Sequence, residues 1–209
     1  MNQHELGLQL SEWGLELGVV INEKQAQQLI LYITELIRWN KKFNLTAIED
    51  PRDAILKHIV DSLSIVPHIP DGSRVIDVGT GAGLPGLVVA LMCPHANITL
   101  LDSQQKKIHF VQHAATTLQL KNINVVHARV ELYQDSVGFD IITSRAFASI
   151  DTFCKTTQHL VAKEGLWLAM KGAFTEQEES LLPGERKVVN IQRLQLPGSG
   201  DQRSLVFIG

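Results

Sequence analysis

The segment from Arg74 to Gly86 constrains the fold more than any other part of the sequence, because it joins an apolar strand to a glycine-rich loop. It reads RVIDVGTGAGLPG, with glycine on the alternate positions 79, 81 and 83. Glycine adopts positive φ without a Cβ penalty and lets a ligand approach the main chain closely. A strand followed by this spacing therefore predicts a ligand laid against backbone.

The glycines alone leave two kinds of ligand open. Gly81, Gly83 and Gly86 also fit the G-x-G-x-x-G spacing that holds a dinucleotide pyrophosphate at a helix N-terminus. Two neighbours favour a cationic ligand. The carboxylate of Asp77 repels a pyrophosphate and suits an ammonium group, and Pro85 has no N–H to offer a phosphate. We therefore expect the sulfonium methyl donor S-adenosylmethionine here.

Asp102 closes the next apolar run, which spans Ile98 to Leu101. An acidic residue at the end of the second strand can accept both ribose hydroxyls of a bound nucleoside. Taken alone, Asp102 is explained equally well as the start of a loop or the cap of the next helix. Beside the glycine loop, the ribose role is the better explanation.

The remaining sequence predicts an α/β fold with a small helical addition. The chain has 209 residues, of which 44% are hydrophobic, enough for one good core and an appended subdomain. Helical patterns separate the first five of seven strand-like runs, which predicts a parallel sheet, and the last two runs form a hairpin. These runs are Val75–Val78, Ile98–Leu101, Ile123–Val126, Phe139–Thr143, Leu166–Met170, Val188–Leu196 and Ser204–Ile208.

The first 70 residues are helical in pattern. Asn22 and Gln25 form a capping box before a helix that runs to about residue 40. Asp50 caps a further helix with Pro51 in its first turn, and prolines at 67 and 70 end it. We expect residues 1–70 to form an N-terminal helical cap and residues 71–209 to form the domain that binds the methyl donor.

Composition excludes several other classes of protein. The two cysteines, Cys93 and Cys154, lack the spacing of a metal site, and we expect neither a disulfide nor a catalytic thiol. The N-terminus has no basic stretch followed by an apolar run, and the run from Leu87 to Cys93 is too short to cross a bilayer. We expect a cytoplasmic protein that does not contact a membrane.

Charge is spread unevenly along the chain. The formal net charge of −3 and the pI near 6.2 do not by themselves indicate nucleic acid binding. Basic residues nevertheless gather in three places, each of which is explained in isolation as a solvated helix face. The three groups are Arg38 with Lys41 and Lys42, Lys57 with His58, and Lys106 with Lys107 and His109.

Several segments together resemble one family of the class I S-adenosylmethionine-dependent methyltransferases, the 16S ribosomal RNA methyltransferase G family, also called glucose-inhibited division protein B. The segments are Asp77–Gly86, Leu101–Ser103, Ser144–Ala148, Trp39–Thr46 and His58–Ser62. The resemblance covers nearly the whole chain and departs at Ala82, where the family commonly has proline. It implies a Rossmann-like, mostly parallel seven-stranded sheet with one antiparallel strand.

The resemblance also implies a reaction and its partners. The reaction is methylation of guanine nitrogen 7 in the decoding-region loop of the small-subunit RNA, with S-adenosylhomocysteine as product and no metal. The partner is 16S ribosomal RNA or the small ribosomal subunit, and we expect a monomer. Nitrogen 7 has a free lone pair, so no general base is needed, and Arg145 would act by orientation and electrostatics.

The candidate residues follow from the glycine loop, the strand ends and the resemblance. Expected cofactor contacts are Asp77, Gly79, Thr80, Gly81, Gly83, Leu84, Asp102, Ser103, Val130, Glu131 and Arg145. Candidate substrate contacts are Asn44, His58, Phe147 and Lys171. For these four, structural or solvated roles are the alternatives, and for His58 a hydrogen-bonded structural role is the favoured one.

Two other functions remain open at this point. One is an NAD-dependent oxidoreductase on a Rossmann sheet, which Asp77, Pro85 and the long segment ahead of the loop disfavour. The other is a noncatalytic RNA-binding module on a methyltransferase-like scaffold.

Overall fold

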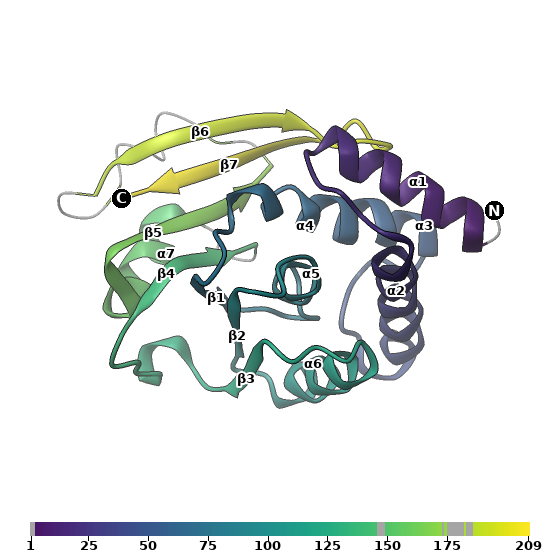
Figure 1. The fold of residues 1–209 in the computed structure, drawn as a ribbon. Helices are drawn as coiled ribbons and strands as arrows, with labels where there is room; N and C mark the ends of the chain where they lie inside the picture. Colours follow the sequence, from purple (N-terminus) through teal and green to yellow (C-terminus); the bar gives the residue numbers. More distant parts are fainter. Residues whose placement is uncertain (1–2, 146–148, 173, 175–181, 183–185) are drawn as a thin grey trace.

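A seven-stranded sheet runs through the middle of the molecule, with helices on both of its faces (Figure 1). The computed structural model describes residues 3–145, 149–172, 174, 182 and 186–209. The strands are β1 (Arg74–Val78), β2 (Asn97–Asp102), β3 (Ile123–His127), β4 (Phe139–Ser144), β5 (Val161–Lys171), β6 (Val188–Gln195) and β7 (Gln202–Ile208). All seven predicted strands are confirmed, with bounds that differ by a few residues.

The strand order is β3-β2-β1-β4-β5-β7-β6. The neighbouring strands β3, β2, β1, β4 and β5 all run parallel to one another, whereas β7 runs antiparallel to both of its neighbours, β5 and β6. The predicted single antiparallel strand and terminal hairpin are therefore confirmed. From β1 the chain continues to β2 and β3 on one side, and it then returns to β4 on the other side of β1. In such sheets, ligands bind outside the carboxyl ends of the strands at the point where the direction changes.

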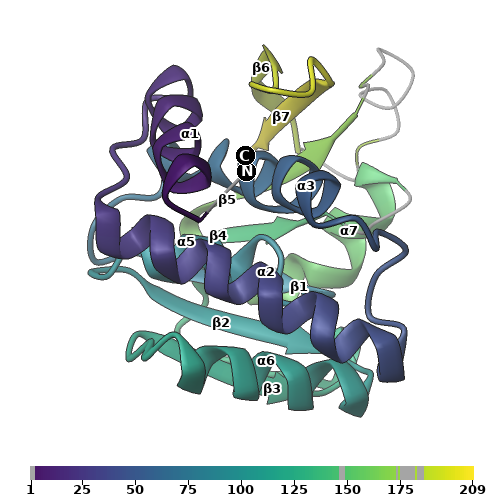
Figure 2. The same ribbon diagram turned by 90° about the vertical axis from the view of Figure 1, so that its right-hand side faces the viewer.

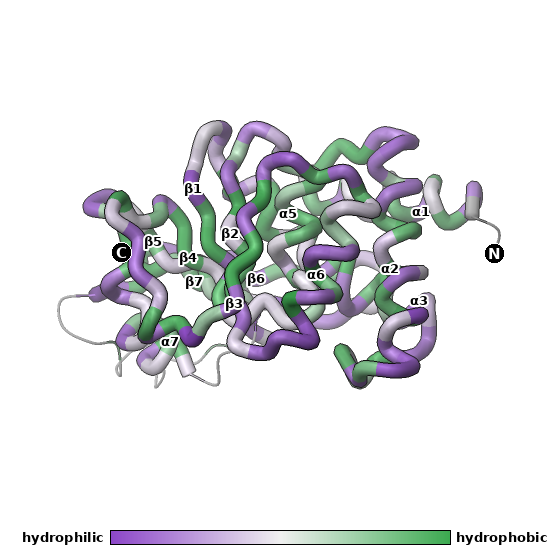
Figure 3. Tube along the Cα trace, turned by 90° about the horizontal axis from the view of Figure 1, so that it is seen from below, coloured by the Kyte–Doolittle hydropathy of each residue, from purple (hydrophilic) through white to green (hydrophobic). Residues whose placement is uncertain are grey.

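Alternate residues of each central strand face opposite layers of the core. In β1, Val75 packs in the layer that contains α5 (Gly86–Met92) and α6 (Gln105–Thr117). Ile76 and Val78 pack in the opposite layer with α7 (Ile150–Thr157). Figure 3 shows α5 as an apolar segment between the sheet and α2, as expected for a helix buried on nearly all sides.

The N-terminal segment folds into helices that cover the α5 and α6 side of the sheet. These are α1 (Gln3–Glu16), α2 (Glu23–Phe43), α3 (Pro51–Ala54) and α4 (Asp61–Leu63), with a π-helical stretch, η1 (Ile55–Val60), between the last two. The 3-10 turns are η2 (Val66–His68), η3 (Val130–Leu132) and η4 (Gln158–Leu160). Figure 2 shows α2 running beside α6 in front of β2.

Local capping signals explain where the N-terminal helices begin. Asn22 Oδ1 accepts from the Gln25 N–H at 2.9 Å, and Gln25 Oε1 accepts from the Asn22 N–H at 3.0 Å, so the predicted capping box is present. Asp50 Oδ1 accepts from the N–H groups of Arg52 and Asp53, which confirms the predicted cap of α3. The sequence did not predict the π turn that follows, which widens the helix at residues 55–60.

The helical cap and the sheet share one hydrophobic cluster. Tyr32 and Trp39 of α2 both lie against Phe110 of α6, with ring centroids 6.2 Å and 5.5 Å apart respectively. The same cluster continues through α5 into β1 and β2. The division of the chain at residue 70 stays a prediction, because side chains on both sides of it pack into this common core.

Candidate functional site

The glycine loop follows β1 at the carboxyl edge of the sheet and needs its glycines for backbone conformation. Gly79, Gly81 and Gly83 have φ values of +70°, +61° and +90°. The N–H groups of Gly79 and Thr80 donate to the carbonyl of Leu101 at 2.8 Å and 3.0 Å. The loop is thus fixed to the end of β2, and Gly79 and Gly81 remain partly exposed.

Asp77 is fully buried beneath this loop. Its Oδ2 accepts from Thr80 Oγ1 at 2.6 Å and from the Gly86 N–H at 2.9 Å. Burial raises its pKa to about 6. The other oxygen, Oδ1, is buried and has no hydrogen-bond partner among the described residues. A buried acceptor without a donor fits a ligand that brings one, such as an ammonium group.

Thr80 supports the loop from within. Its hydroxyl donates to Asp77, its N–H donates to Leu101, and its carbonyl accepts from the N–H groups of Gly83 and Leu84. The Leu84 side chain is also buried, at 4% exposure. Cofactor contacts of Thr80 and Leu84 stay predictions, whereas their part in holding the loop is direct.

Asp102 joins the glycine loop to the start of α6. Its Oδ2 accepts from the Gly81 N–H at 2.9 Å, and its Oδ1 accepts from the Gln104 N–H at 2.8 Å. Lys107 Nζ lies 3.7 Å from the same carboxylate. Each carboxylate oxygen accepts more than one hydrogen bond, so the predicted ribose contact is compatible with these partners. Ser103, the next residue, is exposed.

The predicted adenine contacts follow β3. Val130 and Glu131 form η3, with Val130 buried and Glu131 exposed. Both lie beyond the carboxyl end of β3, two strands from the glycine loop. Their contact with a nucleoside stays a prediction.

Arg145 follows β4 and lies in a network that links the sheet to the helical cap. One guanidinium nitrogen donates to the Lys57 carbonyl at 2.9 Å and lies 3.5 Å from Asp61 Oδ2. Arg203 of β7 donates from Nε to Asp61 Oδ1 at 2.9 Å. The Asp61 side chain is only 3% exposed, so one buried carboxylate positions two arginines from strands far apart in the sequence.

His58 lies in the π turn and uses both ring nitrogens. Nδ1 lies 3.3 Å from Arg145 Nη2, and Nε2 lies 3.0 Å from Thr46 Oγ1. A guanidinium only donates, so Nδ1 accepts and the neutral ring carries its proton on Nε2. Burial, helped by the Arg145 charge, lowers the pKa of His58 to about 4. The favoured prediction of a hydrogen-bonded role agrees with this geometry.

Basic side chains from four regions surround a cavity of about 400 Å³, here called the cation pocket. Its lining residues are Ile48, Lys57, His58, Asp61, Arg145, Met170, Lys171, Gly172 and Arg203. Three predicted site residues, Arg145, His58 and Lys171, are therefore brought together. Sequence reasoning missed Arg203, because no local motif marks it.

The other two substrate candidates are placed differently. Asn44 is exposed and caps the C-terminus of α2 in the left-handed conformation, with φ of +48°. Phe147 lies outside the described residues.

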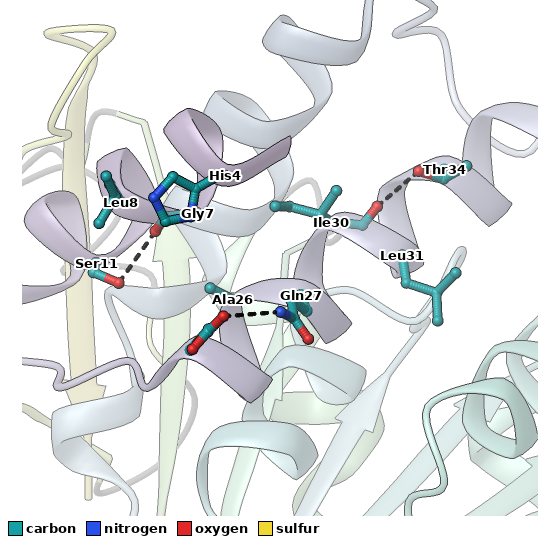
Figure 4. A pocket seen from close by; sticks show the side chains of 10 residues that line it. His4, Gly7, Leu8, Ser11, Ala26, Gln27, Ile30, Leu31 and Thr34 are labelled. Carbon is teal, nitrogen blue, oxygen red and sulfur yellow. Dashed lines mark hydrogen bonds between the residues drawn. The ribbon is translucent and has the colours of Figure 1, made fainter. Parts of the chain in front are cut away.

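A larger cavity of about 600 Å³ lies between α1 and α2. Figure 4 shows Leu8, Ile30 and Leu31 among the side chains around it. None of the predicted site residues lines it, so it is separate from the glycine loop and the cation pocket.

The described part of the chain offers neither a metal site nor a reactive thiol. No group of three histidine, cysteine or carboxylate side chains there can hold a metal ion. Burial raises the pKa of Cys93 to about 11 and that of Cys154 to about 12, so both stay protonated and poorly nucleophilic. Among the described helices, none combines the length and the hydropathy of a membrane-spanning segment.

Comparisons with known proteins agree on one family. A family model described as "rRNA small subunit methyltransferase G" matches residues 25–206. A ribosomal RNA small subunit methyltransferase G from Pseudomonas paraeruginosa is 43% identical over 92% of this chain and 90% of its own. One from Methylobacillus flagellatus is 43% identical over 99% of this chain and 97% of its own.

Solved structures show the fold. A crystal structure described as a SAM-dependent methyltransferase from Aquifex aeolicus matches with a TM-score of 0.58 at 15% identity. The match covers 79% of this chain and 96% of that one. The Rossmann-like methyltransferase fold is therefore confirmed.

Proposed function

Because the chain belongs to the family of ribosomal RNA small subunit methyltransferases G, we propose that it transfers a methyl group from S-adenosylmethionine to a base of small-subunit ribosomal RNA. One observation in the structure carries this proposal. The glycine loop, with a buried carboxylate oxygen that lacks a donor among the described residues, and the cation pocket both lie at the carboxyl edge of the sheet. A cationic methyl donor and an anionic nucleic acid can therefore bind at one edge.

The residues of the loop fit the cofactor. Asp77 Oδ1 would accept from the ammonium group of the methionine part, and Asp102 from the ribose hydroxyls. Glu131 and the backbone of Val130 would accept from the adenine amino group. The partly exposed backbone at Gly79 and Gly81 leaves the ligand room beside the main chain.

The proposed acceptor is nitrogen 7 of guanine, as the resemblance to the family implies. Its lone pair forms the new bond to the methyl carbon while the carbon–sulfur bond breaks and its electrons return to sulfur. Positive charge moves from the sulfonium to the guanine, and no proton leaves the acceptor. The protein supplies alignment, which is worth up to about 7–11 kcal/mol, and an electrostatic environment for the moving charge.

The cation pocket would hold the RNA. Arg145 follows β4 and Lys171 is the last residue of β5, and an arginine fork and a lysine ammonium both bind phosphate. His58, neutral and buried, would position Arg145 and not act as a base. A ribosomal RNA substrate also implies 16S RNA or the small subunit as the partner and the cytoplasm as the place of action. We propose that the enzyme acts there as a monomer.

The test is methyl transfer from labelled S-adenosylmethionine to small subunits and to their naked RNA. The proposal predicts saturable binding of S-adenosylhomocysteine and label in RNA, and both are lost in a Gly79→Asp variant, which puts a charged side chain at a positive-φ position in the loop. Absence of transfer to both substrates by the parent protein overturns it. Thermal protection by NAD but not by S-adenosylhomocysteine would point to an oxidoreductase instead.

A further inference from the structure

The C-terminal turn of α2 and the first turn of α6 form a surface that the proposed chemistry does not use. Its residues are Lys41, Lys42, Phe43 and Lys106, here called the α2–α6 surface. All four are exposed, and Phe43 retains 40% exposure despite its large apolar ring. The fold thus combines two of the basic groups that the sequence showed as separate.

The contacts of this surface hold its parts together. Lys106 Nζ donates to the Phe43 carbonyl at 3.0 Å, which fixes the ammonium group beside the aromatic residue. The Phe43 ring lies 5.3 Å from the Trp39 ring, centroid to centroid, so its inner side is packed. Within the described ranges, neither Lys41, Lys42 nor Lys106 pairs with a carboxylate. The surface is therefore positively charged around a partly exposed ring.

The α2–α6 surface is connected to both parts of the proposed active site. On one side, Lys107, next to Lys106, reaches Asp102, which accepts from Gly81 of the glycine loop. On the other side, Asn40 Oδ1 accepts from the Thr46 N–H at 2.9 Å, and Thr46 Oγ1 meets His58 at the cation pocket. This ion pair and these hydrogen bonds place the surface at the same edge as the site.

We propose that the α2–α6 surface binds a single-stranded stretch of the substrate RNA next to the modified base. The lysines contact phosphates, and Phe43 stacks on an unpaired base, a combination that suits flexible single strands better than a rigid duplex. The inference rests on the proposed function and adds a second contact region beyond the cation pocket. It also explains how a chain with net charge −3 can bind RNA, since the cation pocket and the α2–α6 surface both present basic side chains at the same edge.

The test compares two triple variants. Lys41→Gln/Lys42→Gln/Lys106→Gln removes the charges of the surface. The matched control, Lys24→Gln/Lys121→Gln/Lys163→Gln, removes three exposed lysines elsewhere. Lys24 lies at the opposite end of α2, roughly 27 Å from Lys42 at 1.5 Å per helical residue. Glutamine removes the charge, is one atom shorter than lysine and has a similar helix propensity.

The first variant should bind unmodified small-subunit RNA at least about tenfold more weakly than the control. The slope of log affinity against log salt concentration should fall by about 0.7 for each phosphate that the variant no longer neutralises. KM for RNA should rise, while kcat and the affinity for S-adenosylhomocysteine stay within about twofold. If the triple variant does not fold, Lys41→Gln alone should show a smaller change of the same kind.

A second pair of variants tests the ring. Phe43→Leu should weaken RNA binding by about fivefold or more, because leucine is apolar but cannot stack on a base. Phe43→Trp should bind RNA about as well as the parent protein, because tryptophan is apolar and also stacks. Val137→Ala, at another exposed apolar side chain, should change nothing. Equal RNA binding by the surface and control triples, or by Phe43→Leu and Phe43→Trp, overturns the inference while methyl transfer by the parent protein still stands. Loss of methyl transfer in the parent protein would overturn the proposed function itself.

Discussion

The hydroxyl of Tyr32 donates to the carbonyl of Ala82 at 2.6 Å, which joins the middle of α2 to the glycine loop. Tyr32 is 1% exposed, and burial raises the pKa of its phenol above the ordinary value of 10.0. The phenol therefore stays protonated, and its hydroxyl can donate this hydrogen bond at any pH at which the protein is folded. The helical cap thus holds the loop directly, although 50 residues separate the two partners.

Removing this contact tests its role. Tyr32→Phe keeps the ring and leaves the Ala82 carbonyl without its donor, which should cost about 1–3 kcal/mol of unfolding free energy. Affinity for S-adenosylhomocysteine should fall several-fold, because the loop loses a support. Urea denaturation and calorimetric titration measure the two effects, and unchanged cofactor affinity would show that the loop holds its shape without α2.

Gly86 is a second support of the loop. A Cβ at this position would lie 2.0 Å from Leu100 Cδ2 and 2.8 Å from Asp77 Oδ2. Gly86→Ala should therefore displace Asp77 and weaken S-adenosylhomocysteine binding by at least about tenfold. Gly7→Ala, where the nearest atom to the added Cβ is 3.8 Å away, is the control and should leave binding unchanged. Similar affinities of the two variants would contradict this account of the loop.

The shared carboxylate of Asp61 gives a third prediction. Asp61→Asn leaves the Arg145 and Arg203 guanidinium groups without their common counter-charge, so unfolding free energy should fall by about 1–3 kcal/mol and KM for RNA should rise. Asp53→Asn, which removes an exposed partner of Lys57, should cost at most about 1 kcal/mol. Denaturation curves and methyl-transfer kinetics distinguish them, and equal effects would mean that Asp61 does not position the arginines.

The lowered pKa of His58 predicts that the stability of the protein depends on pH. Its pKa is about 4 in the folded protein and near 6.5 in the unfolded chain. Between these values the unfolded chain binds a proton that the folded protein does not, so stability should fall as the pH drops from 6.5 toward 4, by up to about 3 kcal/mol. The raised pKa of Asp77, about 6 against 3.8, acts in the opposite direction between pH 6 and 3.8.

The measurement is unfolding free energy against pH for the parent protein, His58→Gln and Asp77→Asn. Loss of stability on acidification should be smaller in His58→Gln and larger in Asp77→Asn. Parallel curves for all three proteins would contradict the assignments.

Asp77 also predicts a pH dependence of cofactor binding. Only the ionised carboxylate attracts an ammonium group, so affinity for S-adenosylhomocysteine should fall about tenfold per pH unit below about 6. Asp77→Asn should bind weakly at every pH. Calorimetric titration between about pH 5 and 8 checks this, and a flat profile in the parent protein would remove the proposed ammonium contact.

Much of the fold follows from local sequence patterns. Each strand is predicted by its apolar run, and the capping box at Asn22 and Gln25 is predicted from residue types alone, because both depend on neighbours a few positions apart. The glycine loop is found in the same way. The strand β1 and the positive-φ glycines that follow it lie in one contiguous segment, so the sequence alone is enough to predict them.

The parts that sequence patterns miss depend on distant partners. Arg203 meets Asp61 across 142 positions, and Tyr32 reaches the loop from a helix whose pattern indicates only a buried face. The π turn at residues 55–60 has no simple sequence signal, since its apolar spacing also fits an α-helix. Thr80 is predicted as a cofactor contact, and only the structure shows that its hydroxyl is bound to Asp77.

The most direct test of the account is to map the methylated base. Small subunits that lack the modification are incubated with the protein and S-adenosylmethionine, and their RNA is then reduced and treated with aniline, which cleaves the chain at 7-methylguanine. The account predicts a single new cleavage at one guanine in 16S RNA, dependent on both the protein and the methyl donor. Methylation that reaches the RNA but produces no such cleavage, or no methylation at all, would contradict it.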